Sequence, residues 1–230
     1  MEAKKVRRLR NERDGLLRER LPILRKFYEA CVSTYPVNSI IPTAADLFLD
    51  PFVQNIIINT PSVEPFTDKD LAEVEAALPD IIFRWRKQTE EKLLNMITQA
   101  CGIQDTTESI LQLATTVFSC KSCSAEALTY PRVLVHHCAT DYYYPREVDE
   151  DLSAVHSFLG RVYWNNGNRI SFDAQKITPL IEAIKLCGLD PKSATGEDMD
   201  KRNAIFECHS CNDARKGRCT LTWKGVVCLS

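Results

Sequence analysis

The feature that most constrains this chain is a group of metal-ligand residue types between positions 118 and 138. Cys120 and Cys123 stand as C-x2-C, and after twelve residues His136 and Cys138 follow as H-x-C. A C-x2-C turn directs two sulfur atoms at one point, and a spacer of this length lets the chain fold back to complete a tetrahedral site. The spacing therefore predicts one closed, structural zinc site formed by these four residues, rather than buried cysteines that pack as small apolar side chains.

The conformation expected around the second half of this motif is a strand. If residues 132–138 are extended, His136 and Cys138 lie on the same face, because side chains alternate along a strand. His137 would then point away from the ion.

A second group of cysteines lies close to the C-terminus and predicts a second metal site. Its candidate ligands are a further C-x2-C pair and two later cysteines: Cys208, Cys211, Cys219 and Cys228. Zinc ribbons join two such pairs on one ion, so the spacing leaves open a rival site that combines Cys120 and Cys123 with Cys208 and Cys211. Both arrangements use zinc as the cofactor.

Length and composition are those of an ordinary globular chain. It has 230 residues, of which 44% are hydrophobic and 26% charged, and its formal net charge is -2. A chain of this length can bury a core without metal, so zinc is expected to hold only one part of the fold. The near-neutral charge provides no general attraction to nucleic acid or anionic lipid.

The chain contains ten cysteines and opens with charged residues. A start without a signal peptide indicates a reducing compartment, in which these cysteines stay reduced. The first residues of the chain lack the apolar segment of a signal peptide, and no apolar run reaches the ~20 residues that a membrane span requires. We therefore expect a protein of the cytoplasm or nucleus with no membrane partner. In such a compartment paired cysteines bind metal instead of forming disulfides.

The hydrophobic pattern predicts an α+β fold in three consecutive parts. Residues 1–35 form an N-terminal helix, 36–115 a further helical region, and 116–230 a zinc-binding α+β region, because strand and turn signals replace helical periodicity after residue 116. The helical N-terminal half is expected to pack on the smaller zinc-binding half.

Prolines and turn residues give three local expectations. Pro22 should kink or split the first helix, and Pro79 should end one helix or stand in the first turn of the next. The sequence NNGN at 165–168 predicts a hairpin between strands at 162–164 and 170–172.

No catalytic constellation is recognisable. Zinc hydrolases and deaminases carry H-E-x-x-H, or H-x-E with P-C-x-x-C, and neither pattern occurs. A cysteine nucleophile needs a base placed beside it, whereas the consecutive residues His136, His137 and Cys138 point in different directions. We therefore expect that the protein is not an enzyme.

Nucleic-acid binding is the alternative function. Basic residues collect around the second cysteine group: Arg202, Arg215, Lys216, Arg218 and Lys224. Cations on a zinc knuckle commonly bind phosphate. Acidic residues stand among them, however, and aromatic side chains for base stacking are scarce beyond Trp223, so this function ranks second.

Several motifs resemble, in order, the C-terminal region of a large set of mushroom-type (basidiomycete) fungal proteins, many of them named F-box or F-box-like. The motifs are F-x-C-x2-C at 118–123, YPRVLVHHC at 130–138, C-G-L-D-P-x2-A-T at 187–195, a second F-x-C-x2-C at 206–211 and TWKGVV at 222–227. The residues themselves predict a non-catalytic, intracellular protein-interaction module with structural zinc. The resemblance implies that this module derives from the substrate-recognition part of an F-box-like protein.

The chain departs from this family in two respects. Family members tend to carry His near the C-terminal end of these motifs, where this chain has Cys228. An F-box shows Leu-Pro followed by Glu and an apolar run, whereas Leu78 and Pro79 are followed by Asp80 and Ile81. No F-box is recognisable, which speaks against docking to a Skp-type adaptor and favours an unidentified protein partner.

Overall fold

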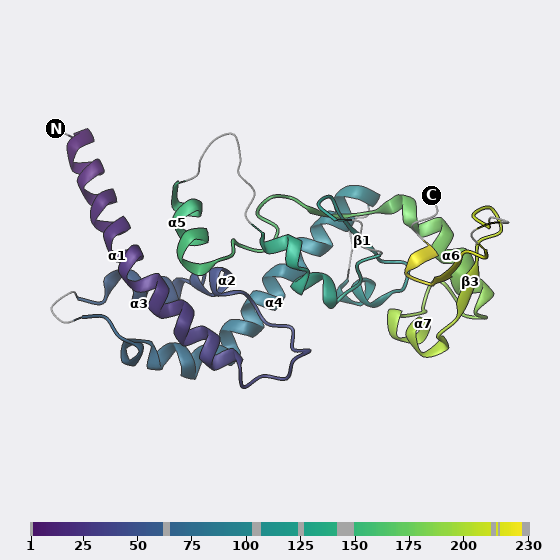
Figure 1. The fold of residues 1–230 in the computed structure, drawn as a ribbon, viewed down its shortest axis with the longest axis horizontal. Coiled ribbons are helices and arrows are strands. Elements are labelled where there is room, and N and C mark those ends of the chain that lie inside the picture. The colour runs from purple at the N-terminus through teal and green to yellow at the C-terminus, as the bar shows by residue number, and fades with distance from the viewer. Residues whose placement is uncertain are drawn as a thin grey trace. The chain divides into compact units, whose positions relative to one another are not determined.

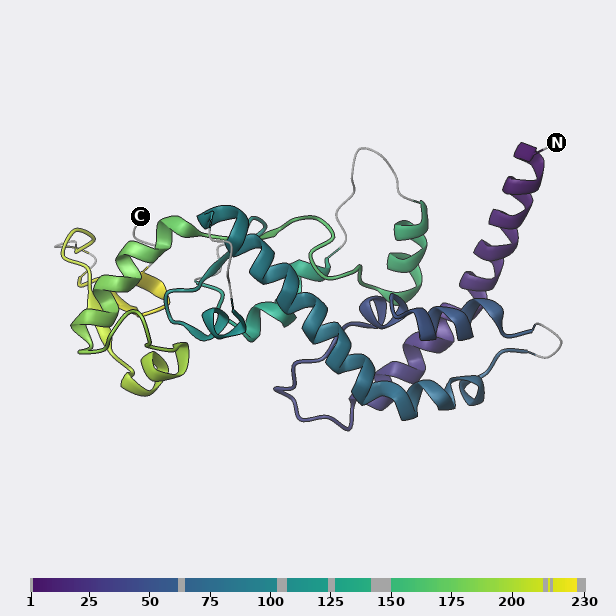
Figure 2. The same ribbon diagram turned by 180° about the vertical axis from the view of Figure 1, so that it is seen from behind.

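The structure is a computed structural model. It describes residues 2–61, 65–102, 107–123, 127–141, 150–212, 215 and 217–226. Within these ranges helices predominate, and the strands form two small two-stranded antiparallel sheets (Figures 1 and 2). The fold class is therefore α+β, and the packing of one half on the other stays a prediction.

Contacts divide the chain into two compact units, each built from two segments. Unit 1 comprises Met1–Gln88 and Ala139–Gly167, and unit 2 comprises Thr89–Cys138 and Asn168–Ser230. This division differs from the three consecutive segments expected from the sequence. The difference arises because residues 139–167 return to the N-terminal helices after the chain has already built part of unit 2.

The regular elements among the described residues of unit 1 are all helices. Its elements are α1 (Glu2–Val32), α2 (Ala44–Phe48), α3 (Pro51–Asn59), η1 (Asp68–Leu71), the first part of α4 (Ala72–Cys101) and α5 (Glu150–Leu159). The boundary between the units falls inside α4. No helix among the described residues combines the length and the apolarity that crossing a membrane would require.

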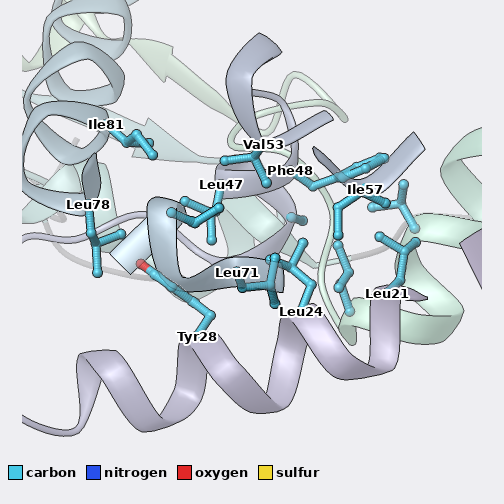
Figure 3. Close-up of a cluster of buried hydrophobic side chains, with 14 of the residues drawn as sticks. Leu21, Leu24, Tyr28, Leu47, Phe48, Val53, Ile57, Leu71, Leu78 and Ile81 are labelled. Carbon is cyan, nitrogen blue, oxygen red and sulfur yellow. The ribbon is translucent and has the colours of Figure 1, made fainter. Parts of the chain in front are cut away.

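One face of α1 packs against the hydrophobic core of unit 1. Leu21, Leu24 and Tyr28 follow one another at three- and four-residue steps and point from α1 into the cluster that contains Leu71 and Ile57 (Figure 3). All five side chains are buried. The Tyr28 hydroxyl donates to the Pro42 carbonyl at 2.9 Å, and burial is the largest cause of a raised pKa for Tyr28.

Neither internal proline ends a helix. Pro22 lies inside the continuous helix α1, so α1 is not split, and Pro79 lies inside the continuous helix α4. The expectation that Pro79 separates two helices is therefore wrong. An internal proline costs about 3 kcal/mol through its missing hydrogen bond and ring clash, but burial of Leu78 and Ile81 beside it favours the uninterrupted helix.

A carboxylate joins α2 to the returning segment of unit 1. Thr43 caps α2 in a capping box with Asp46. Asp46 is only 6% exposed, and its Oδ1 accepts the Trp164 backbone N–H at 2.8 Å. The bond spans 118 residues of sequence and helps to explain why residues 139–167 belong to unit 1.

Replacing Asp46 with Ala removes both the capping box and the acceptor for the Trp164 N–H. We expect the free energy of unfolding to fall by about 1–3 kcal/mol, the usual effect of leaving a buried donor without its partner. Asp198→Ala is the matched control, because Asp198 forms the same capping box with Thr195 at the start of another helix. Chemical denaturation measures both variants, and an equal or smaller loss for Asp46→Ala would contradict the role of the Trp164 bond.

Unit 2 mixes short helices with both sheets. Its elements are the end of α4, η2 (Glu108–Gln112), β1 (Phe118–Cys120), η3 (Arg132–Val135), the start of η4 (His137–Thr140), β2 (Ile170–Phe172), η5 (Ala174–Lys176), α6 (Ile177–Leu186), α7 (Gly196–Arg202), β3 (Ile205–Glu207) and β4 (Thr220–Thr222). The sheets pair β1 with β2 and β3 with β4.

The hairpin expected at residues 165–168 does not form. Strand β2 pairs instead with β1, in the register Phe118↔Phe172 and Cys120↔Ile170, about fifty residues apart in sequence. The rings of Phe118 and Phe172 pack edge to face with their centroids 5.8 Å apart, and Ile170 is buried. This packing outweighs the local turn signal, although Asn165 does adopt the positive φ typical of a turn.

Candidate metal centre

Unit 2 brings the four residues of the first motif together. The ligand atoms of Cys120, Cys123, His136 and Cys138 all lie within 4.8 Å of one another. Cys120 and Cys138 are buried, while Cys123 and His136 are half-buried. The four-residue set inferred from spacing is therefore a cluster in three dimensions, and this Cys3His cluster could hold a metal ion.

The small sheet positions the first cysteine pair. Cys120 is the last residue of β1, which pairs with β2 on one side. On the other side Phe118 exchanges backbone hydrogen bonds of 2.8 and 3.0 Å with Leu128. Beyond the strand the chain turns, and the Ser122 N–H donates to Cys120 Sγ at 3.4 Å. This turn returns Cys123 to the same point, as the C-x2-C spacing predicts.

The second pair is presented by tight helical turns, so the expected extended conformation of residues 132–138 is wrong. Residues Arg132–Val135 and His137–Thr140 form 3-10 turns, and His136 between them is extended. Val133 and Leu134 are consecutive and both fully buried, which a helical turn permits and an alternating strand with one exposed face does not. The turn nevertheless places His136 Nε2 at 3.4 Å from Cys123 Sγ.

His137 also differs from the expectation. A strand would turn it away, but its Nε2 lies 3.2 Å from Cys138 Sγ. His137 is nevertheless exposed and is not a member of the four-residue cluster. His137 therefore contacts the candidate ligand Cys138 without belonging to the four-residue cluster.

Arg169 is a supporting residue that the sequence pattern did not reveal. Its guanidinium donates to the Cys138 carbonyl at 3.2 Å, and its own carbonyl accepts the Lys121 N–H at 2.9 Å. One residue thus holds the backbone beside both halves of the motif. Neither spacing nor residue type distinguishes this arginine from the others in the sequence.

The thiols influence one another strongly. Burial is the largest single influence on the pKa of Cys120 and would raise it, but hydrogen bonds from the N–H groups of Ser122 and Cys123 and from the thiols of Cys123 and Cys138 lower it overall. The pKa of Cys138 is raised to about 12, first by burial and then by Cys123 and Cys120. The thiolate form is therefore favoured at Cys120 and opposed at Cys138. A bound cation would favour the thiolate form at both residues.

The donor set and spacing suit zinc. Tetrahedral zinc takes sulfur at about 2.3 Å and imidazole nitrogen at about 2.0–2.1 Å, which separates a sulfur and a nitrogen ligand by roughly 3.6 Å. The observed 3.4 Å between Cys123 Sγ and His136 Nε2 is close to this value. Three sulfurs and one imidazole supply the four ligands of a closed structural site.

The raised pKa of Cys138 makes the stability of the metal-free protein pH-dependent. A raised folded-state pKa stabilises the fold while the group is protonated, and this contribution is lost as pH rises from 9.0 toward about 12. We therefore expect the free energy of unfolding of the chelated, reduced protein to fall above pH 9. The fall should be smaller in Cys138→Ser, and zinc should suppress it in the wild type. Equal curves for wild type and Cys138→Ser in denaturation at several pH values would contradict this.

The second cysteine group is only partly assembled. Cys208, Cys211 and Cys219 gather at the end of the β3–β4 hairpin, but in the described part of the chain they form no set whose ligand atoms all lie within 4.8 Å of one another. Cys228 and Lys216 lie outside the described residues. The first pair meets His136 and Cys138 rather than Cys208 and Cys211, so the structure does not adopt the rival shared site.

The basic residues near this group have acidic neighbours. Lys224 Nζ lies 3.1 Å from Asp200, and Arg218 lies 3.6 Å from Glu207. Trp223 is only 3% exposed and donates its indole N–H to Asp200 at 2.7 Å, so it packs in the core of unit 2 instead of offering a face to a base. These contacts reduce the positive surface that nucleic-acid binding would use.

Comparison of the chain with models of known protein families, with curated proteins and with solved structures found no significant match.

Proposed function

We propose that this chain is a non-catalytic protein-interaction module whose unit 2 is held together by a structural zinc ion on Cys120, Cys123, His136 and Cys138. The observation that carries the proposal is the convergence of these four ligand atoms within 4.8 Å of one another. Sulfur and imidazole are the ligands that structural zinc prefers, and a bound ion would remove the charge conflict among the thiols.

The closed ligand set supports a structural role. A catalytic zinc ion keeps one position for water or substrate, whereas four protein ligands fill a tetrahedral shell. The ligands come from the end of β1, the following turn and the stretch 136–138, so the ion would cross-link segments that are otherwise short and weakly paired. Zinc would act by stabilising this folded arrangement, as structural zinc does in small domains.

The partner is proposed to be a protein. The resemblance to F-box-like fungal proteins supports a module that presents a recognition surface, derived from a substrate-recognition region. Without a recognisable F-box, the Skp-type adaptor is not the expected partner. Cytoplasm or nucleus remains the expected location, because thiol ligands need a reducing compartment.

The two neighbouring histidines test the metal site directly. Protein purified under reducing conditions should carry at least one zinc equivalent by elemental analysis. His136→Ala and Cys120→Ser should each lose about one equivalent, while His137→Ala should keep it, because His137 is adjacent in sequence but outside the cluster. Cys101→Ser controls for thiol removal, since Cys101 is an exposed free cysteine at the end of α4. Unchanged zinc in both His136→Ala and Cys120→Ser would contradict the site.

The interaction role requires that partner binding depend on the zinc-ordered surface. Affinity capture with wild type, His137→Ala and His136→Ala, quantified by mass spectrometry, should show proteins retained by the first two and lost by the third. Skp-type adaptor peptides among them would support a ligase-linked role. Identical capture by all three would contradict the proposal, and capture that is nuclease-sensitive and falls steeply with salt would favour nucleic-acid binding instead.

A further inference from the structure

We propose that Cys208, Cys211 and Cys219 form a second, solvent-accessible metal site that binds a thiophilic divalent ion such as zinc exchangeably. The site lies at the end of the β3–β4 hairpin. It extends beyond the proposed structural role of the first centre and does not depend on it, because the two sites share no ligand.

The strand register places two of the thiols opposite each other. The β3–β4 pairing runs from Ile205↔Thr222 to Glu207↔Thr220. Just beyond the last pair, the Cys208 N–H donates to the Cys219 carbonyl at 2.9 Å, so these two residues still lie opposite each other. Residues directly opposite in such a ladder project to the same face with Cβ atoms about 4.5–5.5 Å apart, so the thiols of Cys208 and Cys219 share one face.

A turn returns the third thiol to this face. The Cys211 N–H donates to the Cys208 carbonyl at 3.2 Å. This bond closes a tight turn over the C-x2-C pair, as the same spacing does in the first centre, where the Ser122 N–H donates to Cys120 Sγ at 3.4 Å.

Asn212 holds the two arms of the hairpin beside this turn. Its Oδ1 accepts the Cys219 N–H at 2.8 Å, and its Nδ2 donates to Glu207 Oε1 at 2.8 Å. The residue next to Cys211 therefore ties the turn to the opposite strand. The backbone of a hairpin braced in this way brings the three cysteines to one end of it.

Exposure and ligand number separate this site from the first. Cys211 is exposed and Cys208 and Cys219 are half-buried, whereas two ligands of the first centre are buried. Three thiolates leave a fourth position of a tetrahedral ion open to water or to a small thiol. Because the three sulfurs must also draw closer to share an ion, we expect weaker and faster-exchanging binding than at the four-ligand centre.

Metal counting on the full-length protein tests the site. Wild type equilibrated with excess zinc under reducing conditions and then gel-filtered should hold two equivalents, and brief exposure to a competing chelator should remove one. The double variant Cys208→Ser/Cys211→Ser should hold one equivalent that resists the same treatment, and Cys101→Ser should behave as wild type. A single equivalent in the wild type, or two equivalents in the double variant, would overturn the proposal.

Cobalt spectroscopy separates failure of this site from failure of the first. The Cys120→Ser/Cys123→Ser variant, which keeps only one thiol of the first centre, should still bind one Co²⁺ with a thiolate-to-metal charge-transfer band. Adding Cys208→Ser and Cys211→Ser to that variant should abolish the band, with circular dichroism confirming that the helices remain folded. A band that persists at equal intensity after these substitutions would overturn the assignment.

Discussion

The close approach of three sulfurs and one imidazole is the constraint on which unit 2 depends. With the four ligand atoms within 4.8 Å of one another, ionising one thiol opposes ionisation of the others, and the pKa of Cys138 is raised first by burial and then by the neighbouring thiols. A dication reverses the balance, because every thiolate then gains a partner. The same interaction that opposes ionisation in the free protein would therefore stabilise the folded unit once zinc is bound.

The backbone around the cluster is arranged to present these ligands rather than to form extensive sheet. Strand β1 has three residues and gains support from β2, from Leu128 and through Arg169, whose main chain and side chain contact both halves of the motif. Unit 1 differs in how it is stabilised, because α1 and the helices packed against it bury a continuous apolar core. Metal is thus proposed for the unit with the shorter elements, consistent with a local role in a chain long enough to fold elsewhere by burial alone.

Spacing predicted which residues of the first centre meet, but not the conformation that brings them together. C-x2-C and H-x-C fix the ligand set because they limit how far the chain can carry each sulfur and imidazole, whereas 3-10 turns and strands both satisfy that limit over a few residues. Burial of Val133 and Leu134 decided between them. The partner of β2 and the continuity of α4 through Pro79 depended likewise on distant packing, which a local pattern does not contain. The capping boxes at Thr43 and Thr195 are by contrast local, since all their atoms lie within four residues.

The central claim is that one zinc ion is bound by three sulfurs and one imidazole nitrogen. Zinc-edge X-ray absorption on the Cys208→Ser/Cys211→Ser variant observes the first centre alone. The account predicts a four-coordinate shell with sulfur at about 2.3 Å and one imidazole nitrogen at about 2.0–2.1 Å. A shell dominated by oxygen, or one containing two or fewer sulfurs, would contradict it.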